Sequence, residues 1–155
     1  MVSAQLAHKR YTGRMTQDGM CYFFTATKLK PIEGISLFEY DVTYLDWQDS
    51  ITINFTAYTP SADVPVKLAI TNGCTTYLCD NYKHLYLEFR KKGYTARMTS
   101  RYALKDFLQI LQQAQPLQFT FEQDGQQKRA AYKPKAWEKE RKTLNRIFQL
   151  IQSTR

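Results

Sequence analysis

Residues that usually build catalytic and metal sites are scarce in this chain of 155 amino acids. Only two histidines and three cysteines are present, too few for a multi-bridge disulfide framework. The sequence also lacks a glycine-rich phosphate loop, the GxSxG and HExxH patterns, paired CxxC motifs and a calcium-loop motif. We therefore predict no metal, no cofactor and no catalytic residue, and an enzyme is the less favoured alternative.

The cysteines give no sign of an oxidising compartment. Cys74 and Cys79 would point to opposite faces of one extended strand, about 16 Å apart, too far for a disulfide or a shared zinc ion. With Cys21 their number is odd, so we expect reduced thiols that serve as small apolar core residues.

Long apolar runs are also missing. No run reaches the ~18 residues of a membrane-spanning helix, and residues 1–15 contain no hydrophobic segment of signal-peptide type. We expect a cytoplasmic protein without a transmembrane segment, although a leader removed beforehand would leave no trace.

The composition is that of a folded, basic protein. Hydrophobic residues make up 43% of the chain and charged residues 23%, which argues against disorder, and the length fits one domain over residues 1–155. The net charge of +8 is unevenly distributed, because residues 31–66 hold six acidic and no basic side chains while the segments on both sides are basic. Such asymmetry can steer an anionic partner, although solvated faces explain it equally well.

Short turns punctuate the chain and predict β-hairpins. At four points glycine follows Asp, Asn or Lys between stretches of strand-like composition, as in two-residue turns with positive φ. These turns are Asp18-Gly19, Asn72-Gly73, Lys92-Gly93 and Asp124-Gly125, and a looser fifth turn is expected over residues 46–49. About ten strands joined in this way predict a mostly β member of the α+β class, an antiparallel meander curled into a barrel or sandwich.

Two helices are expected among the strands. Ser100 is a plausible N-cap for an internal helix that Pro116 ends. A C-terminal helix over residues 134–153 begins at a proline suited to the first turn and should pack on the sheet. Its apolar stripe contains Trp137, Leu144, Ile147, Phe148 and Ile151, and its opposite face carries the basic residues Lys135, Lys139, Lys142 and Arg146.

One strand carries a face on which we expect binding. His84 alternates with tyrosines opposite the apolar residues Leu85 and Leu87, so it should point away from the apolar side. With a turn at Lys92-Gly93, Glu88 would face Arg97 on the next strand. The candidate binding residues of this sheet face are Tyr82, His84, Tyr86, Arg90 and Arg97.

These features favour a non-catalytic interaction module. The expected partner is a protein or another macromolecule, bound through the tyrosine- and arginine-rich sheet face or through the basic helix. The first alternative is a nucleic-acid-binding protein that acts mainly through charge. The second is a small-ligand carrier or enzyme with a barrel cavity, which requires a hollow interior.

Overall fold

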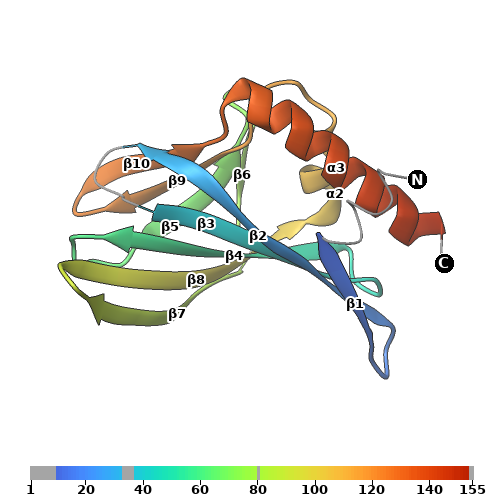
Figure 1. Cartoon of the computed structure of the whole chain (residues 1–155), viewed down its shortest axis with the longest axis horizontal. Coiled ribbons are helices and arrows are strands. Elements are labelled where there is room, and N and C mark those ends of the chain that lie inside the picture. Colours follow the sequence, from blue (N-terminus) through green and yellow to red (C-terminus); the bar gives the residue numbers. More distant parts are fainter. Residues whose placement is uncertain (1–9, 33–36, 80, 154–155) are drawn as a thin grey trace.

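The structure is a computed structural model that describes residues 10–32, 37–79 and 81–153. Over these residues it contains ten strands and two helices, the latter named α2 and α3 in Figure 1. In chain order the elements are β1 (Tyr11–Met15), β2 (Met20–Ile32), β3 (Leu37–Leu45), β4 (Ser50–Thr59), β5 (Val66–Thr71), β6 (Thr76–Leu78), β7 (Asn81–Arg90), β8 (Gly93–Ala103), α2 (Leu104–Leu111), β9 (Gln118–Gln123), β10 (Gln126–Ala131) and α3 (Pro134–Ser153).

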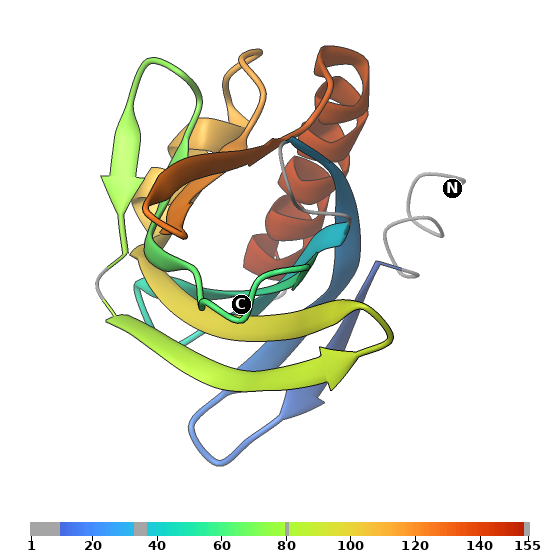
Figure 2. The same ribbon diagram turned by 90° about the vertical axis from the view of Figure 1, so that its left-hand side faces the viewer.

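The strands form two antiparallel sheets that share β2. The strand order is β6-β5-β9-β10-β2-β3-β4-β8-β7, and β1 pairs with β2 off this path. Residues Cys21–Leu29 of β2 pair with β3 around a bulge after Phe24, and the end of β2, Lys30–Ile32, pairs with β10. The strands curve around a common interior (Figure 2), but β6 and β7 stay at opposite ends of the order. The predicted antiparallel sandwich is confirmed, and the described strands do not close into a barrel.

All five predicted hairpins are confirmed, but the loops at Asp18-Gly19 and Asn72-Gly73 have four residues each and are not the two-residue turns predicted there. Each expected turn joins two antiparallel strands that follow one another in the chain. Asp124 and Gly125 both have positive φ, 56° and 69°, as the two-residue turn between β9 and β10 requires. The chain then departs from a simple meander, because β4 pairs with β8 and not with β5. The hairpin β5–β6 crosses to the other sheet, where β5 pairs with β9.

Aromatic rings fill the space between the sheets. Phe38 and Phe55 from the larger sheet stack with centroids 5.3 Å apart, and Phe38 lies 5.3 Å from Phe119 on β9 of the smaller sheet. All three side chains are fully buried. The alternation of buried and half-buried residues along β3 follows directly from the pleat, which points successive side chains to opposite faces.

The C-terminal helix packs on the sheet through its predicted apolar stripe, all of whose members are buried. Phe148 lies 5.3 Å from Phe24 and 5.7 Å from Tyr44, between ring centroids. The fully buried Trp137 contacts the ring of Tyr132, and its indole N–H donates to the carbonyl of Gln113 at 3.0 Å. Helix α3 therefore fills the core beside the aromatic rings of the sheets.

The predicted start of the internal helix was wrong. Ser100 lies inside β8, where its buried hydroxyl donates to the carbonyl of Ile53 at 3.0 Å, and α2 begins at Leu104 after Ala103, which makes no side-chain cap. The strand extends further than expected because its ladder with β4 continues to the pair Ser50 and Ala103. Tertiary pairing outweighs a local capping signal here.

Trp137 provides a direct test of the importance of α3. We expect Trp137→Ala to lower the free energy of unfolding by about 3–5 kcal/mol, because it empties a fully packed aromatic site. The control Lys139→Ala, on the exposed face of the same helix, should change it by about 0.5 kcal/mol or less. Chemical denaturation measures both values, and equal effects of the two substitutions would contradict the packing of α3.

Candidate binding surface on strand β7

A β-bulge divides the sheet face on which the sequence placed the binding residues. The register of β7 against β8 shifts between His84 and Tyr86, so that Leu85 is the extra residue. Before the bulge, His84 faces the buried Met98, whereas after it Tyr86 faces Arg97. The prediction of one common face was therefore wrong, because one inserted residue exchanges the faces of all residues beyond it.

The outer face holds Tyr86, Arg90 and Arg97 of the predicted set. The predicted cross-strand pair of Glu88 with Arg97 does not form. Arg97 instead binds Asp41 of β3 at 2.9 Å, and Glu88 binds Arg90 on its own strand at 2.8 Å. Arg97 also donates to the hydroxyl of Thr56 at 2.8 Å. It is thus held by the sheet, whereas Arg90 lies exposed near the end of β7.

The inner face holds Tyr82 and His84. The hydroxyl of Tyr82 donates to the carbonyl of Pro65, the residue before β5. Nε2 of His84 lies 2.9 Å from the hydroxyl oxygen of Tyr82. The hydroxyl of Tyr82 also lies 3.1 Å from Sδ of Met98. Burial, with a smaller contribution from Cys79, raises the pKa of Tyr82 from 10.0 to about 12. Tyr82 therefore connects the start of β7 to the smaller sheet.

The second half of β7 exposes apolar side chains that the sequence analysis assigned to an apolar face. Leu85, Leu87 and Phe89 are 51%, 41% and 74% exposed, and Tyr86 is 39% exposed. Leu87 and Phe89 face Ala96 and Tyr94 of β8, on the inner side of the sheet. Sequence reasoning missed them as surface residues, because alternating apolar residues on a strand normally indicate a buried face.

Three consecutive cations follow this apolar stretch. Arg90, Lys91 and Lys92 are all exposed. The turn lies one residue earlier than predicted, since Arg90 pairs with Gly93, and Lys92 takes the positive φ of 146°. Gly93 is needed elsewhere: a Cβ at this buried position would approach the carbonyl oxygen of Thr59 to 2.6 Å. The glycine thus permits close contact with β4. Because Gly93 pairs with Arg90, the turn between them consists of Lys91 and Lys92.

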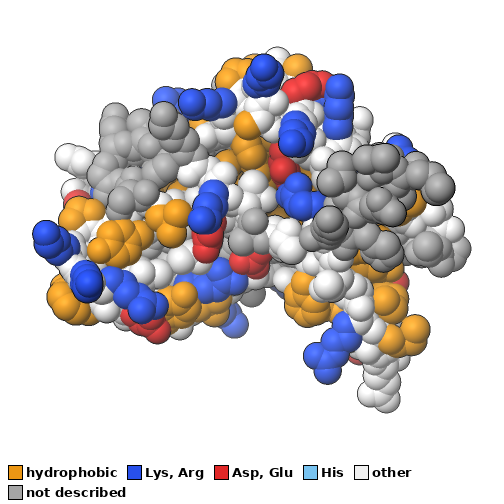
Figure 3. Space-filling model, in the orientation of Figure 1, with side chains coloured by type: hydrophobic (Ala, Val, Ile, Leu, Met, Phe, Trp, Pro, Cys, Tyr) orange, Lys and Arg blue, Asp and Glu red, His pale blue; other side chains and the backbone are white. Residues whose placement is uncertain are grey.

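We call the exposed second half of this hairpin the β7 surface. It comprises Leu85, Tyr86, Leu87, Glu88, Phe89, Arg90, Lys91 and Lys92. In Figure 3 cationic side chains lie among apolar ones over the left-hand ends of β7 and β8.

The predicted basic face of the C-terminal helix is fully accessible. Its four residues, Lys135, Lys139, Lys142 and Arg146, are all exposed. Lys142 lies 3.5 Å from Glu138, which also binds Arg141. These ion pairs hold the pKa of Glu138 below its usual value of 4.5. The helix face thus carries cations with acidic neighbours, and it is separate from the β7 surface.

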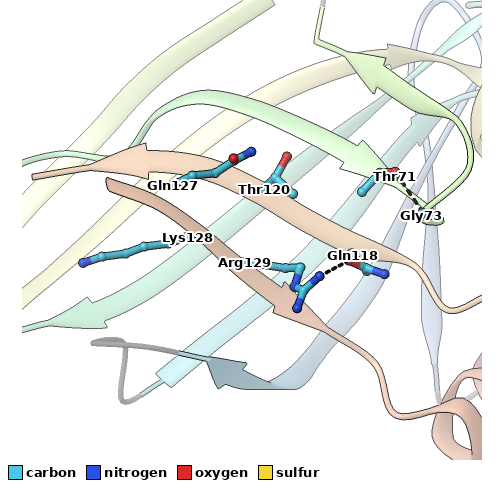
Figure 4. A pocket seen from close by; sticks show the side chains of 7 residues that line it. All are labelled: Thr71, Gly73, Gln118, Thr120, Gln127, Lys128 and Arg129. Carbon is cyan, nitrogen blue, oxygen red and sulfur yellow. Dashed lines mark hydrogen bonds between the residues drawn. The ribbon is translucent and has the colours of Figure 1, made fainter. Parts of the chain in front are cut away.

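A polar pocket of about 390 Å³ lies over the smaller sheet (Figure 4). Its walls come from β5, β9, β10 and the turn after β5, and they consist of Thr71, Gly73, Gln118, Thr120, Gln127, Lys128 and Arg129. Arg129 donates to Gln118 at 3.4 Å. The buried ammonium of Lys128 on β10 donates to Gln123 at the end of β9 at 2.7 Å. No aromatic ring or carboxylate lines this pocket, so it offers no acid–base pair.

A buried polar cluster lies between α3 and the sheet. Glu140 of α3 accepts from Arg10 at 2.5 and 3.2 Å, and the hydroxyls of Tyr40 and Tyr132 lie 2.8 Å apart. Burial and the neighbouring carboxylate of Glu140 raise the pKa of both tyrosines. The cluster attaches the residue before β1 to the C-terminal helix, which is a structural role.

The cysteines differ in their surroundings. None is disulfide-bonded; Cys21 is buried, Cys79 is half-buried and Cys74 is exposed, so the expected core position is wrong for Cys74. In the described ranges no group of three or more His, Cys, Asp or Glu side chains is placed to hold a metal ion. None of the described helices is long and apolar enough to cross a membrane.

Comparisons of the chain with protein-family models, curated protein sequences and solved structures yield no significant match. The chemistry of its surfaces is therefore the basis for assigning a function.

Burial of the Tyr82 hydroxyl makes stability depend on alkaline pH. The folded state favours the neutral phenol, so this stabilisation is complete below pH 10 and is lost as the pH rises towards 12. We expect the tyrosinate absorbance of the wild type minus that of Tyr82→Phe to show one group titrating near pH 12. Titration near pH 10 in this difference would mean that this hydroxyl is exposed in solution.

Proposed function

We propose that this chain is a non-catalytic interaction module that binds an acidic macromolecular partner through the β7 surface. One observation carries the proposal: apolar side chains are exposed along a strand at the edge of the sheet, directly before three exposed cations. Contiguous exposed apolar residues with a polar rim are typical of interaction sites. Aromatic rings and arginine are also enriched where protein interfaces bind most strongly.

The geometry favours this surface over the sheet face first predicted. Arg97 already has a carboxylate partner, His84 binds Tyr82, and Tyr82 also binds Pro65. A partner would have to displace these contacts, at a cost in hydrogen bonds. Phe89 and the two lysines of the turn need no such rearrangement, because they are already exposed.

A charge-matched pair of variants tests the proposal. The variant Arg90→Gln/Lys91→Gln/Lys92→Gln removes the cations of the β7 surface, and Lys135→Gln/Lys139→Gln/Lys142→Gln removes equal charge from α3. The probe is poly-L-glutamate, and titration calorimetry at moderate salt measures its affinity. We expect roughly tenfold weaker binding for the first variant only, because exposed pairs contribute about 0.2–1 kcal/mol each. Weaker binding only for the helix variant would contradict the proposal.

Nucleic-acid binding through the basic helix is the second candidate. It is favoured by four exposed cations on one face of α3, of which Lys142 has an ion-pair partner. If they contact phosphates, replacing all four with Gln should flatten the salt dependence of single-stranded DNA binding by up to about four units of log–log slope. We expect no submicromolar binding at physiological salt. Such binding by the wild type, lost in this variant, would make the second candidate the better one.

A further inference from the structure

Strand β7 ends the larger sheet with one side of its backbone unpaired by any described strand. It pairs with β8 only, and it is the last strand in the order. In an antiparallel ladder, alternate residues turn their N–H and C=O groups away from the neighbouring strand. With ten residues, β7 is much longer than β6, the three-residue strand at the other end. Long edges of this kind accept further strands unless the protein protects them.

The first half of β7 is protected by a bulge and a tether, whereas the second half is protected only by charged side chains, Glu88 and Arg90. The bulge at Leu85 interrupts the ladder, and the hydroxyl of Tyr82 fastens the strand to Pro65. Bulges and charged side chains are common means of blocking strand edges. From Tyr86 to Arg90 the register against β8 is regular again, so this half can take a new strand.

The two faces of this segment differ in chemistry. Leu87 and Phe89 point to the inner side, where Leu87 is partly and Phe89 mostly exposed. Tyr86, Glu88 and Arg90 point to the outer side, where Glu88 and Arg90 form an ion pair, and Lys91 and Lys92 add positive charge in the turn. A strand laid beside β7 would meet an apolar face and a polar face that is positively charged next to the turn, so we expect its own residues to alternate between apolar and acidic.

We propose that Tyr86–Arg90 of β7 binds an extended protein segment of alternating apolar and acidic residues, which adds to the sheet as one more strand. This inference rests on the proposed function and specifies how the partner is bound. Main-chain hydrogen bonds supply affinity in this mode, and pockets for alternate side chains supply specificity.

Other occupants fit the surface less well. A second copy of the chain carries the same net charge of +8, which opposes its association, and its own Tyr86–Arg90 segment offers only one acidic residue, Glu88. A lipid surface would be met best by apolar residues gathered at the tip of the hairpin, whereas here they are spread along the strand on both of its faces.

Peptide probes test strand addition directly. The first probe is a peptide as long as β7 that alternates Val and Glu. The second has the same composition with all Val before all Glu, and the third is the first with alternate backbone amides N-methylated. We expect the first to bind at least about tenfold more tightly than the other two and to slow amide exchange in Tyr86–Arg90. Equal affinities of the three peptides, or no slowing of amide exchange, would overturn strand addition.

Two double variants locate the binding site. Leu87→Lys/Phe89→Lys should abolish binding of the alternating peptide, while Leu78→Lys/Cys74→Lys, near the opposite edge of the sheet, should leave it unchanged. All four positions are exposed, and thermal melting should show that both variants fold. Loss of peptide binding in the Leu78→Lys/Cys74→Lys variant alone would overturn the assignment of the binding site to β7.

The poly-L-glutamate experiment separates the two levels of the proposal. If the β7 surface binds poly-L-glutamate but does not distinguish the three peptides, strand addition fails and the interaction surface stands. If removing the cations of the β7 surface weakens binding of neither poly-L-glutamate nor the alternating peptide, both the interaction surface and strand addition fail. Anionic vesicles serve as a further probe: tighter binding to them than to the alternating peptide would replace the peptide with a lipid surface as the occupant.

Discussion

Contacts among phenylalanine rings hold the two sheets of this protein together. Phe38 and Phe55 belong to neighbouring strands of the larger sheet, and Phe38 contacts Phe119 and Phe121 of the smaller sheet at 5.3 and 6.0 Å between ring centroids. Large aromatic side chains bury much apolar surface and dominate core energetics. Because these rings come from β3, β4 and β9, their packing also fixes which strands lie at the centre and which lie at the edges.

The exposed apolar residues of β7 follow from this arrangement. Strand β8 lies next to β4, so its inner residues Ala96 and Met98 still reach the core and are buried. Strand β7 lies one position further out, beyond the reach of the smaller sheet except where Tyr82 contacts Pro65. Leu87 and Phe89 therefore point to the inner side but stay exposed, Leu87 in part and Phe89 mostly. Their exposure results from topology and not from poor packing.

Folding also rearranges the uneven charge of the chain. The acidic segment includes β3 and β4, of which β4 lies beside the basic strand β8, and Asp41 of β3 binds Arg97 across β4. Part of the charge asymmetry is thus neutralised inside one sheet. Exposed cations without such a partner across the sheet include those of the β7–β8 turn and of the exposed face of α3. Long-range attraction of an acidic partner can act at both surfaces.

Local signals alone determined much of the fold. The five hairpins follow from turn chemistry and strand alternation, and the apolar stripe of α3 follows from helical spacing, so neighbours in the chain decide both. The pairing of β4 with β8, the bulge at Leu85 and the contact of Gly93 with Thr59 depend on segments distant in sequence. The faces of Tyr82, His84 and Tyr86 were therefore decided only by tertiary structure, because one bulged residue reverses the side of every residue that follows it.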